Sequence, residues 1–452
     1  MTRTAAAVLC VLLLPNGQAD ARTWTVGGAG ADYPVVAPAI LAASDGDTVV
    51  VRRGVYREDL IVDRTLTLIG EGWPVLIGTG AGTVVEIRAS GSEVSGFVIE
   101  GSGVGLTNQM DAAVHLMGDG NRVAANVMRR VFYGVVIIGT ADNEVADNTI
   151  EGLADLPFGR RGDGVYAFRA PDSRVLRNRI GGMRDGIYFQ HTPRGVAEGN
   201  LVERSRYGLH DMFSDGARIE GNTFRDSSVG ATVMNSAGIT IRGNRIERNR
   251  GVSAVGLSIK QCDDSLVEDN LIAGNVRGAL LDGSSGNRFV RNRFVRNDTA
   301  VSLFASAEGN VFAGNVFDDN WSDVVIAGRG SDTRWDEGGR GNRWSRYRGF
   351  DFDGDGVGDT PHPLLGPFER LEGHQPATRL FLQSPAALAL GLAASAGLAA
   401  PGGAIDAAPL AGPEGSGGPQ RNASGALAGG LLTLGVGFAL FRFRREGRSC
   451  CR

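Results

Sequence analysis

Cysteine is scarce in this chain of 452 residues, which holds only four. Cys10 lies in the first apolar segment, and Cys450 and Cys451 lie at the far end. Cys262 is therefore the only cysteine in the body of the chain, and we expect no disulfide within it. Packing must then stabilise the fold.

Aromatic residues and excess charge are also in short supply. Aromatic side chains make up 7% of the chain, and the formal net charge is -4. Without a basic excess the chain lacks the electrostatic footprint of nucleic-acid binding, so we expect no nucleic-acid partner. The 3.6-residue apolar period of a helical solenoid is absent as well. Glycine, by contrast, is abundant at 68 residues, which favours turns and short strands.

Both ends of the chain carry apolar segments. Arg3, the apolar run at 5–14 and the small residues Ala19 and Ala21 match a secretory signal peptide over residues 1–21. Near the other end, residues 423–441 are almost wholly apolar, and a basic cluster follows at 442–452. This order predicts a membrane-spanning helix at 423–441 with a basic cytoplasmic tail.

Asparagine marks a repeat of about 22 residues. Its members are Asn126, Asn148, Asn178, Asn200, Asn222, Asn244, Asn270, Asn292 and Asn315, with longer spacings where a loop is inserted. Glycines keep the same period, at Gly164, Gly186, Gly208, Gly230, Gly256 and Gly278. A period this short indicates stacked units that share one core. We interpret the asparagines as a ladder at a turn, where their side chains tolerate left-handed backbone geometry and bond to the backbone.

Apolar residues alternate after each glycine, and Val165, Ile187 and Leu209 share one inward register. The units are too short for a β-propeller. The sequence therefore predicts an all-β fold, a right-handed parallel β-helix over residues 22–345, with strands about 4.8 Å apart. We expect a cap helix at 35–44 followed by the first strand at 49–51, an Asp-rich loop and C-terminal cap at 346–378, and an apolar docking segment with a Gly/Pro-rich linker at 379–422.

Strand alternation places the residues two and four positions after each glycine on the exposed outside. The first set is Tyr166, Tyr188, His210, Thr232 and Ser258, and the second is Phe168, Gln190, Met212, Met234 and Lys260. Imidazole and thioether together suit copper, and thioethers favour the reduced ion, so His191, His210, Met212 and Met234 are candidate copper ligands. The alternative is a partner-binding stripe that includes Tyr166, Tyr188 and Lys260.

The segment after the repeats has the spacing of a calcium loop. Asp351, Asp353, Asp355, Val357 and Asp359 stand at alternate positions, with a glycine at position six. The bidentate glutamate expected at position twelve is replaced by a histidine. A calcium site and a purely structural Asp/Gly turn both remain open.

Catalysis on acidic sugars, which some β-helix proteins perform, needs a carboxylate pair or a carboxylate with a basic partner in a cleft. Asp211 is one of a few scattered candidates. We expect no tight Asp/His/Arg cluster on one face, and therefore no enzymatic activity.

Three segments resemble one known family. They are residues 208–215, Gly-Leu-His-Asp-Met-Phe-Ser-Asp, residues 256–260, Gly-Leu-Ser-Ile-Lys, and residues 341–347, Gly-Asn-Arg-Trp-Ser-Arg-Tyr, which run into the Asp-rich loop. They resemble the NosD family, periplasmic accessory proteins for the maturation of nitrous oxide reductase. The resemblance extends from about Trp24 to Leu410. It departs at Asp211 and Arg343, where the family more often has tyrosine.

The resemblance implies a non-catalytic periplasmic role in assembling the copper-sulfur centre of that reductase. The implied partners are an ABC transporter of permease and ATPase, a copper-carrying lipoprotein and nitrous oxide reductase itself. In this frame Trp344 and Tyr347 are candidate partner contacts, residues 385–400 take the place of a docking helix, and the terminal helix anchors the protein to the inner membrane. The alternative function is a polysaccharide-binding or polysaccharide-modifying β-helix protein, with Tyr166 and Tyr188 stacked on sugar rings.

Overall fold

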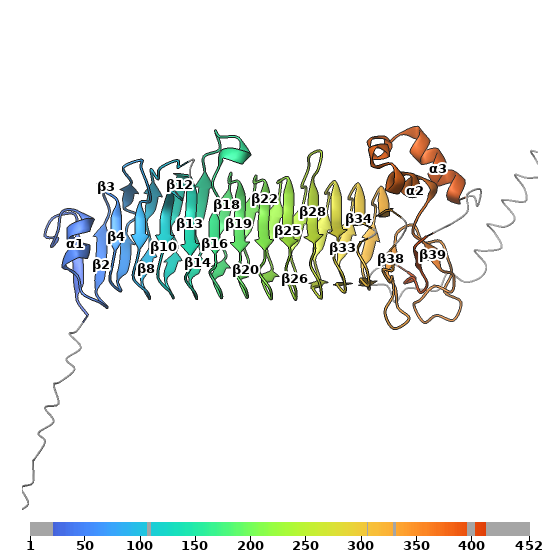
Figure 1. Cartoon of the computed structure of the whole chain (residues 1–452), viewed down its shortest axis with the longest axis horizontal. Helices are drawn as coiled ribbons and strands as arrows, with labels where there is room; N and C mark the ends of the chain where they lie inside the picture. The colour runs from blue at the N-terminus through green and yellow to red at the C-terminus, as the bar shows by residue number, and fades with distance from the viewer. Residues whose placement is uncertain (1–20, 106–109, 305, 329–330, 396–402, 413–452) are drawn as a thin grey trace, which may run out of the picture.

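Three long parallel sheets wind around one axis and enclose an apolar core, so the fold is a parallel β-helix, as predicted (Figure 1). The computed structural model describes residues 21–105, 110–304, 306–328, 331–395 and 403–412. The predicted signal peptide, apart from its last residue, and the predicted span at 423–441 with its basic tail lie outside these residues. Within them, no helix is both long enough and apolar enough to cross a membrane.

The first sheet has 13 strands. In spatial order they are β1 (Thr23–Val26), β2 (Thr48–Arg52), β5 (Thr67–Glu71), β8 (Glu93–Ser95), β11 (Arg122–Ala124), β14 (Glu144–Ala146), β17 (Arg174–Leu176), β20 (Val196–Glu198), β23 (Arg218–Glu220), β26 (Thr240–Arg242), β29 (Leu266–Glu268), β32 (Arg288–Val290) and β35 (Val311–Ala313).

The second sheet has 12 strands and carries the candidate site. They are β4 (Leu60–Val62), β7 (Val85–Ile87), β10 (Ala112–Leu116), β13 (Tyr133–Ile138), β16 (Val165–Phe168), β19 (Asp185–Gln190), β22 (Tyr207–Met212), β25 (Val229–Met234), β28 (Val255–Lys260), β31 (Arg277–Asp282), β34 (Thr299–Phe304) and β37 (Ser322–Ala327).

The third sheet has 13 strands. They are β3 (Val55–Arg57), β6 (Val75–Ile77), β9 (Val98–Glu100), β12 (Val127–Val131), β15 (Thr149–Gly152), β18 (Arg179–Gly181), β21 (Leu201–Glu203), β24 (Thr223–Arg225), β27 (Arg245–Glu247), β30 (Leu271–Ala273), β33 (Arg293–Val295), β36 (Val316–Asp318) and β38 (Arg343–Trp344).

The repeat keeps every rung in register. Tyr188 pairs with His210, and His210 with Thr232, each 22 residues further along the chain. The alternation predicted after the glycines is confirmed, because Val165, Ile187, Leu209 and Leu257 are all fully buried in the core.

The asparagines form a buried ladder, as predicted. In each rung the side-chain oxygen accepts the backbone N–H of the preceding asparagine, as between Asn200 and Asn222 at 2.9 Å, and the side-chain amide donates to a backbone carbonyl, as from Asn222 to Ala197 at 2.8 Å. The predicted left-handed geometry is displaced by one residue. It falls on the residue before the asparagine, with φ of 53° at Arg177 and 63° at Gly221. The asparagine is thus held inward while its neighbour makes the turn.

The N-terminal end is covered by helix α1 (Val36–Ala42), close to the range predicted for the cap helix. The expectation that the chain enters its first strand after this helix is wrong, because β1 precedes α1 and pairs with β2. The sequence 23–26 alternates threonine with apolar residues and forms a strand of its own.

The C-terminal end is closed by side chains rather than by a further rung. Trp344 stacks on Phe317 at 4.1 Å, and its Nε1–H donates to Asp406 Oδ2 at 2.8 Å. Asp406 belongs to a short antiparallel pair, β39 (His362–Pro363) and β40 (Ile405–Asp406). The same carboxylate accepts the backbone N–H of Asn342 at 2.7 Å, which ends the asparagine ladder.

Helices at this end pack on the second sheet. Helix α2 (Pro367–His374) lies against β37, and α3 (Pro385–Ser395) packs on α2 beside the short 3-10 helix η2 (Pro376–Phe381). A further short helix, η1 (Phe158–Arg160), stands on the loop inserted between β15 and β16 (Figure 1).

Candidate metal centre

Two rows of side chains run along the outward face of the second sheet, with one residue of each row from every rung. In β22, Leu209 and Asp211 face the core, so His210 and Met212 face outward. Strand register then assigns Tyr166, Tyr188, His210, Thr232 and Ser258 to the first row, and Phe168, Gln190, Met212, Met234 and Lys260 to the second.

The exposure predicted for the first row is wrong. Tyr166, His210, Thr232 and Ser258 are buried, and His210 is only 9% exposed. The cause is the close spacing of the rungs, which stacks each large ring on the next: the rings of Tyr188 and His210 lie 4.2 Å apart and within 3° of parallel. In the second row Met212, Met234 and Lys260 are half-buried.

His210 is oriented by a buried carboxylate. Its Nδ1 lies 3.1 Å from Asp185 Oδ2, one rung earlier. Burial raises the pKa of Asp185, but hydrogen bonds from His210 and Arg206 outweigh it and hold that pKa below its ordinary value. Asp185 is therefore a carboxylate that can only accept, so Nδ1 of His210 donates to it, and in the neutral imidazole the lone pair lies on Nε2. Nε2 is buried and has no hydrogen-bond partner among the residues that the structure describes.

Asp185 belongs to a ladder of buried ion pairs beside this histidine. Arg206 bonds both oxygens of Asp185 at 2.9 and 2.6 Å, and Arg184 bonds both oxygens of Asp163 at 2.9 and 2.6 Å. Complete burial raises the pKa of Asp163 to about 7, although Arg184 opposes the rise. The expectation that the chain has no tight Asp/His/Arg cluster is therefore wrong. The oxygens of both carboxylates are committed to these partners, which leaves the cluster suited to orienting His210.

The four candidate copper ligands do not all converge. Met212 and Met234 are direct neighbours across strands β22 and β25, on the same outward face as His210. His191 stands apart at the corner after β19, where φ is 51°, and its ring lies between those of Phe168, at 5.9 Å, and Phe213, at 4.9 Å. The structure thus groups His210, Met212 and Met234 and sets His191 beside them in an aromatic row.

These residues fit a copper ion by their chemistry. A neutral imidazole and thioethers are soft and borderline donors that suit reduced copper. A buried nitrogen without a partner costs about 1–3 kcal/mol, which a bound ligand would offset. A carboxylate on the other ring nitrogen is the usual outer-shell support of a metal-binding histidine. His210 meets both conditions within the described residues.

The Asp-rich loop brings together three of its five predicted calcium ligands. Asp351, Asp353 and Asp359 place one carboxylate oxygen each within 4.8 Å of one another. Asp355 and Val357 do not join this group: the Asp355 N–H donates to Asp353 Oδ1 at 3.2 Å, and Asp355 Oδ1 accepts the Val357 N–H at 2.7 Å. Asp351 accepts the N–H groups of Gly354 and Gly356 at 2.7 and 3.0 Å, so the backbone itself folds the loop around it.

The residues predicted to contact partners differ in how exposed their side chains are. Trp344 is 3% exposed and closes the core, so its role as a partner contact is wrong. Tyr347 is half-buried, and its hydroxyl donates to the Thr360 carbonyl at 2.8 Å. Tyr166 donates to Gln190 Oε1 at 2.9 Å and is buried, and its ring tilts against that of Tyr188 at 5.3 Å. Neither ring of this pair offers a free platform for a sugar.

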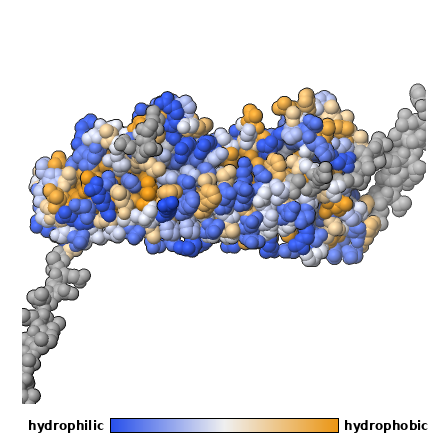
Figure 2. Space-filling model, in the orientation of Figure 1, coloured by the Kyte–Doolittle hydropathy of each residue, from blue (hydrophilic) through white to orange (hydrophobic). Residues whose placement is uncertain are grey.

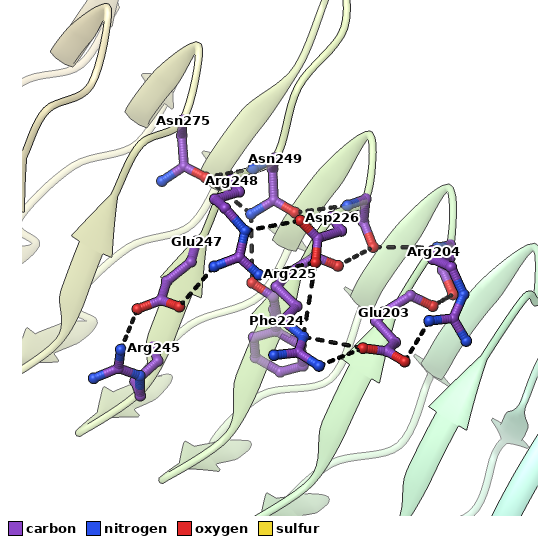
Figure 3. Close-up of polar contacts among 12 residues, drawn as sticks. Glu203, Arg204, Phe224, Arg225, Asp226, Arg245, Glu247, Arg248, Asn249 and Asn275 are labelled. Carbon is purple, nitrogen blue, oxygen red and sulfur yellow. Dashed lines mark hydrogen bonds and ion pairs between the residues drawn. The ribbon is translucent and has the colours of Figure 1, made fainter.

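A pocket of about 630 Å³ lies elsewhere, on the side of the third sheet. Phe158 of the β15–β16 loop, Ser227, Ser228, Arg248 and Arg250 are among its lining residues. Figure 3 shows Arg248 of this lining bonded to Asp226 and Glu247. Arg250 bonds both carboxylate oxygens of Asp298, so both lining arginines are paired with carboxylates.

Sequence reasoning missed the residues that support His210. Asp185 precedes His210 by 25 residues, which is one repeat and three positions, so the period alone could have brought the two together. The signal is an arginine two positions before the periodic glycine in both rungs, in Arg-Asp-Gly at 184–186 and Arg-Tyr-Gly at 206–208.

Comparisons with known proteins fit this geometry. The model of the family described as "Periplasmic copper-binding protein (NosD)" matches residues 152–349, which include His210, Met212 and Met234. A protein of Pseudomonas aeruginosa named "Probable ABC transporter binding protein NosD" is 39% identical over 347 residues, covering 74% of this chain and 80% of that protein. A protein of the same name from Stutzerimonas stutzeri is 36% identical over 350 residues, covering 74% and 79%.

Among solved structures, a family 28 exopolygalacturonase from Yersinia enterocolitica shares the fold, with a TM-score of 0.50, 11% identity and coverage of 70% of this chain and 79% of that one. At 11% sequence identity this similarity supports a shared β-helix fold and says nothing about function. The two bacterial relatives, by contrast, match most of this chain and most of their own length. The chain therefore belongs to the NosD family of periplasmic proteins.

Proposed function

We propose that this protein carries copper(I) at His210, Met212 and Met234 and acts with an ABC transporter in assembling the copper-sulfur centre of nitrous oxide reductase. In this role the chain is a non-catalytic maturation factor, and copper is its cargo. The observation that carries the proposal is the buried Nε2 of His210, which has no hydrogen-bond partner among the described residues. Asp185 fixes the ring, and Met212 on the same strand and Met234 on the next strand stand on the same outward face.

Each residue has a part that its position supports. Asp185 accepts a hydrogen bond from Nδ1 of His210, which leaves Nε2 as the ring nitrogen that can bind copper. The half-buried thioethers of Met212 and Met234 supply soft donors that do not titrate. Transient loading suits this set, because it has no thiolate and its two methionines are half-buried rather than fully enclosed.

Anaerobic titration with copper(I) against a chromophoric chelator tests the ligand set. The triple variant His210→Ala, Met212→Leu and Met234→Leu should lose one copper ion per chain. Met128→Leu is the matched control, since Met128 is fully buried in the core. Wild-type stoichiometry and affinity in the triple variant would remove the ligand assignment.

We propose further that the apolar surface of η2 and α3 docks the transporter permease. Leu380, Phe381, Leu388 and Leu392 are 85%, 62%, 54% and 71% exposed. Figure 2 shows apolar surface gathered over this end of the molecule, at the upper right. Exposed apolar groups of this size, clustered on adjacent short helices, are typical of a protein or membrane contact.

Co-purification from membranes tests the docking surface. Leu388→Ser together with Leu392→Ser should reduce recovery of the permease and ATPase with this protein. Leu41→Ser is the matched control, because Leu41 is 72% exposed on α1 at the opposite end. Unchanged recovery with the α3 variant, or an equal loss with the α1 variant, would contradict the assignment.

Lys260 allows the outward face around His210, Met212 and Met234 to be probed for protein partners. It is the only lysine in the chain and stands next to Met234 in the second row. An amine-reactive crosslinker can therefore attach only there and at the N-terminus. We expect Lys260 to crosslink to the copper lipoprotein or the reductase, with Lys260→Arg as the control that abolishes the product.

We also propose that the Asp-rich loop binds calcium weakly and stiffens the C-terminal closure. Three carboxylates within 4.8 Å repel one another, and a divalent ion relieves that repulsion. Calcium should raise the melting temperature of the wild type but not of Asp353→Asn. Identical melts with calcium and with chelator would leave the loop as a structural turn.

The alternative function, binding or modifying polysaccharide, makes a separate prediction. It requires retention of an alginate-like or pectin-like polymer by the purified protein. If such binding is tight and copper binding is absent, the polysaccharide reading replaces the copper reading.

A further inference from the structure

The methionines of this protein fall into two groups. Six lie in the described residues, and two of them, Met128 and Met183, are fully buried in the core. Met212 and Met234 belong to strands β22 and β25, on the outward face that also carries His210. The remaining two, Met110 and Met117, lie at β10, three rungs before β19 on the same sheet. Every described methionine that reaches the surface is thus on or beside the second sheet.

Met117 stands two residues after a histidine, as Met212 does. In β10, Val114 and Leu116 are fully buried, so His115 and Met117 face outward. Register pairs His115 with Val136, which pairs with Tyr166 and then Tyr188, so His115 belongs to the same first row as His210. Met117 follows Leu116 and is therefore level with the second row, where it is 47% exposed. The pair His115–Met117 repeats the geometry of His210–Met212.

His115 also repeats the chemical feature that distinguishes His210. Its Nε2 is buried, and no described residue forms a hydrogen bond with it. Its neighbour in the preceding rung is Glu86, which faces outward beside it. Met110 packs on the adjacent apolar cluster of Ala112, Val136 and Tyr166, where its thioether is half-buried. An imidazole nitrogen, one exposed thioether and a second thioether nearby are again donors for a soft monovalent cation.

We propose that His115 and Met117, with Met110 as a further thioether, form a second copper(I) site on the outward face of the second sheet. Four strand spacings separate His115 from His210, which is about 19 Å, so one ion cannot serve both. The protein therefore binds two monovalent ions on one face. The choice of copper rests on the proposed function, while the site rests on residues that lie outside the first centre.

Stoichiometry tests the second site. Wild-type protein titrated anaerobically with copper(I), and separately with silver(I) as a redox-inert probe, should bind two ions. His115→Gln with Met117→Leu should bind one, and His210→Gln with Met212→Leu should also bind one. The four-residue combination should bind none. Met128→Leu should keep two ions, and thermal melts should show that each variant is folded.

The outcomes separate this inference from the proposed function. One ion in the wild type, kept in the His115 variant and lost in the His210 variant, overturns the second site and leaves the first. One ion kept in the His210 variant and lost in the His115 variant supports the second site and overturns the first. Binding that survives in the four-residue variant overturns both, because the ions then sit elsewhere.

Discussion

At the residue scale, the site depends on one hydrogen bond that fixes a tautomer. Asp185 is buried, paired with Arg206 and bonded to Nδ1 of His210, so Nε2 is the nitrogen of that imidazole left available to a metal ion. Alternation along the strand was enough to predict that His210 and Met212 face outward. It could not predict that His210 is buried, because burial comes from the rings of Tyr188 and Tyr207 in other positions of the sheet.

Removing the charge of Asp185 should weaken copper(I) binding. In Asp185→Asn the amide can turn either atom toward His210, and loss of an outer-shell carboxylate typically costs about 10–100-fold in metal affinity. Asp163→Asn is the control, since Asp163 is equally buried and pairs with Arg184 without touching the histidine. Both variants should melt earlier, but only Asp185→Asn should lose affinity. Equal affinity in the two would contradict the orienting role.

Because of Asp211, the free energy of unfolding should fall as the pH rises. It faces the core in β22, where burial raises its pKa well above the ordinary value. A raised pKa means that the folded state binds more protons, so this contribution is complete below the unfolded pKa and is lost as pH rises toward the folded one. The Ser236 hydroxyl lies 3.2 Å from Asp211 Oδ1 and 3.0 Å from the Met234 carbonyl, and its single proton serves only one of them. A protonated Asp211 can donate to Ser236 instead.

The variant Asp211→Asn cannot ionise at this position. Its free energy of unfolding relative to the wild type should therefore rise by up to about 1.4 kcal/mol per pH unit above pH 4. Chemical denaturation at pH 5 and pH 8 measures this difference. If the difference in free energy of unfolding between the two proteins were the same at both pH values, Asp211 would not titrate in this range.

At the element scale, the rung is defined by its asparagine more than by its strands. The strands of the first and third sheets are mostly three residues long, too short to be stable alone. The 22-residue period predicted the rungs because each asparagine must stand at one fixed place to bond its neighbour. It could not predict that the left-handed residue precedes the asparagine, since arginine, aspartate and glycine all occupy that place. The strand at 23–26 was missed because it lies before the repeat begins.

Asn222→Ala should destabilise the protein by about 3 kcal/mol, because it leaves the buried backbone N–H of Asn200 and carbonyl of Ala197 without partners. Asn249→Ser is the matched control. Serines already fill the equivalent place one and two rungs earlier, at Ser227 and Ser205, so this change should cost clearly less. Denaturation midpoints compare the two. Similar losses of stability would mean that the asparagine is as important in the row of Asn249 as in the row of Asn222.

At the scale of the whole molecule, the proposed copper site and the proposed docking surface both adjoin the second sheet. Helix α2 packs on β37, the last strand of the sheet that carries His210. Four strand spacings, about 19 Å, separate β25 from β37. A transporter held at α3 would therefore stand next to the copper row. The sequence predicted the β-helix and both outward rows, while the placement of α2 and α3 depends on contacts between segments far apart in the chain.

Removing residues 413–452 should release the protein from the membrane, because the predicted span lies there. Cell fractionation should then recover the shortened protein in the periplasmic fraction, folded and with unchanged copper(I) affinity. Retention in the membrane fraction in a strain without the transporter would contradict the anchor. Retention only when the transporter is present would point to α3 as the remaining contact.

The most direct test of the central claim is the metal content and visible spectrum of nitrous oxide reductase from a strain that lacks this gene. The account predicts a reductase that has its two-copper centre and lacks its four-copper sulfide centre, with recovery on complementation by the wild type but not by the triple variant of His210, Met212 and Met234. A fully loaded reductase in the deletion strain would contradict the account.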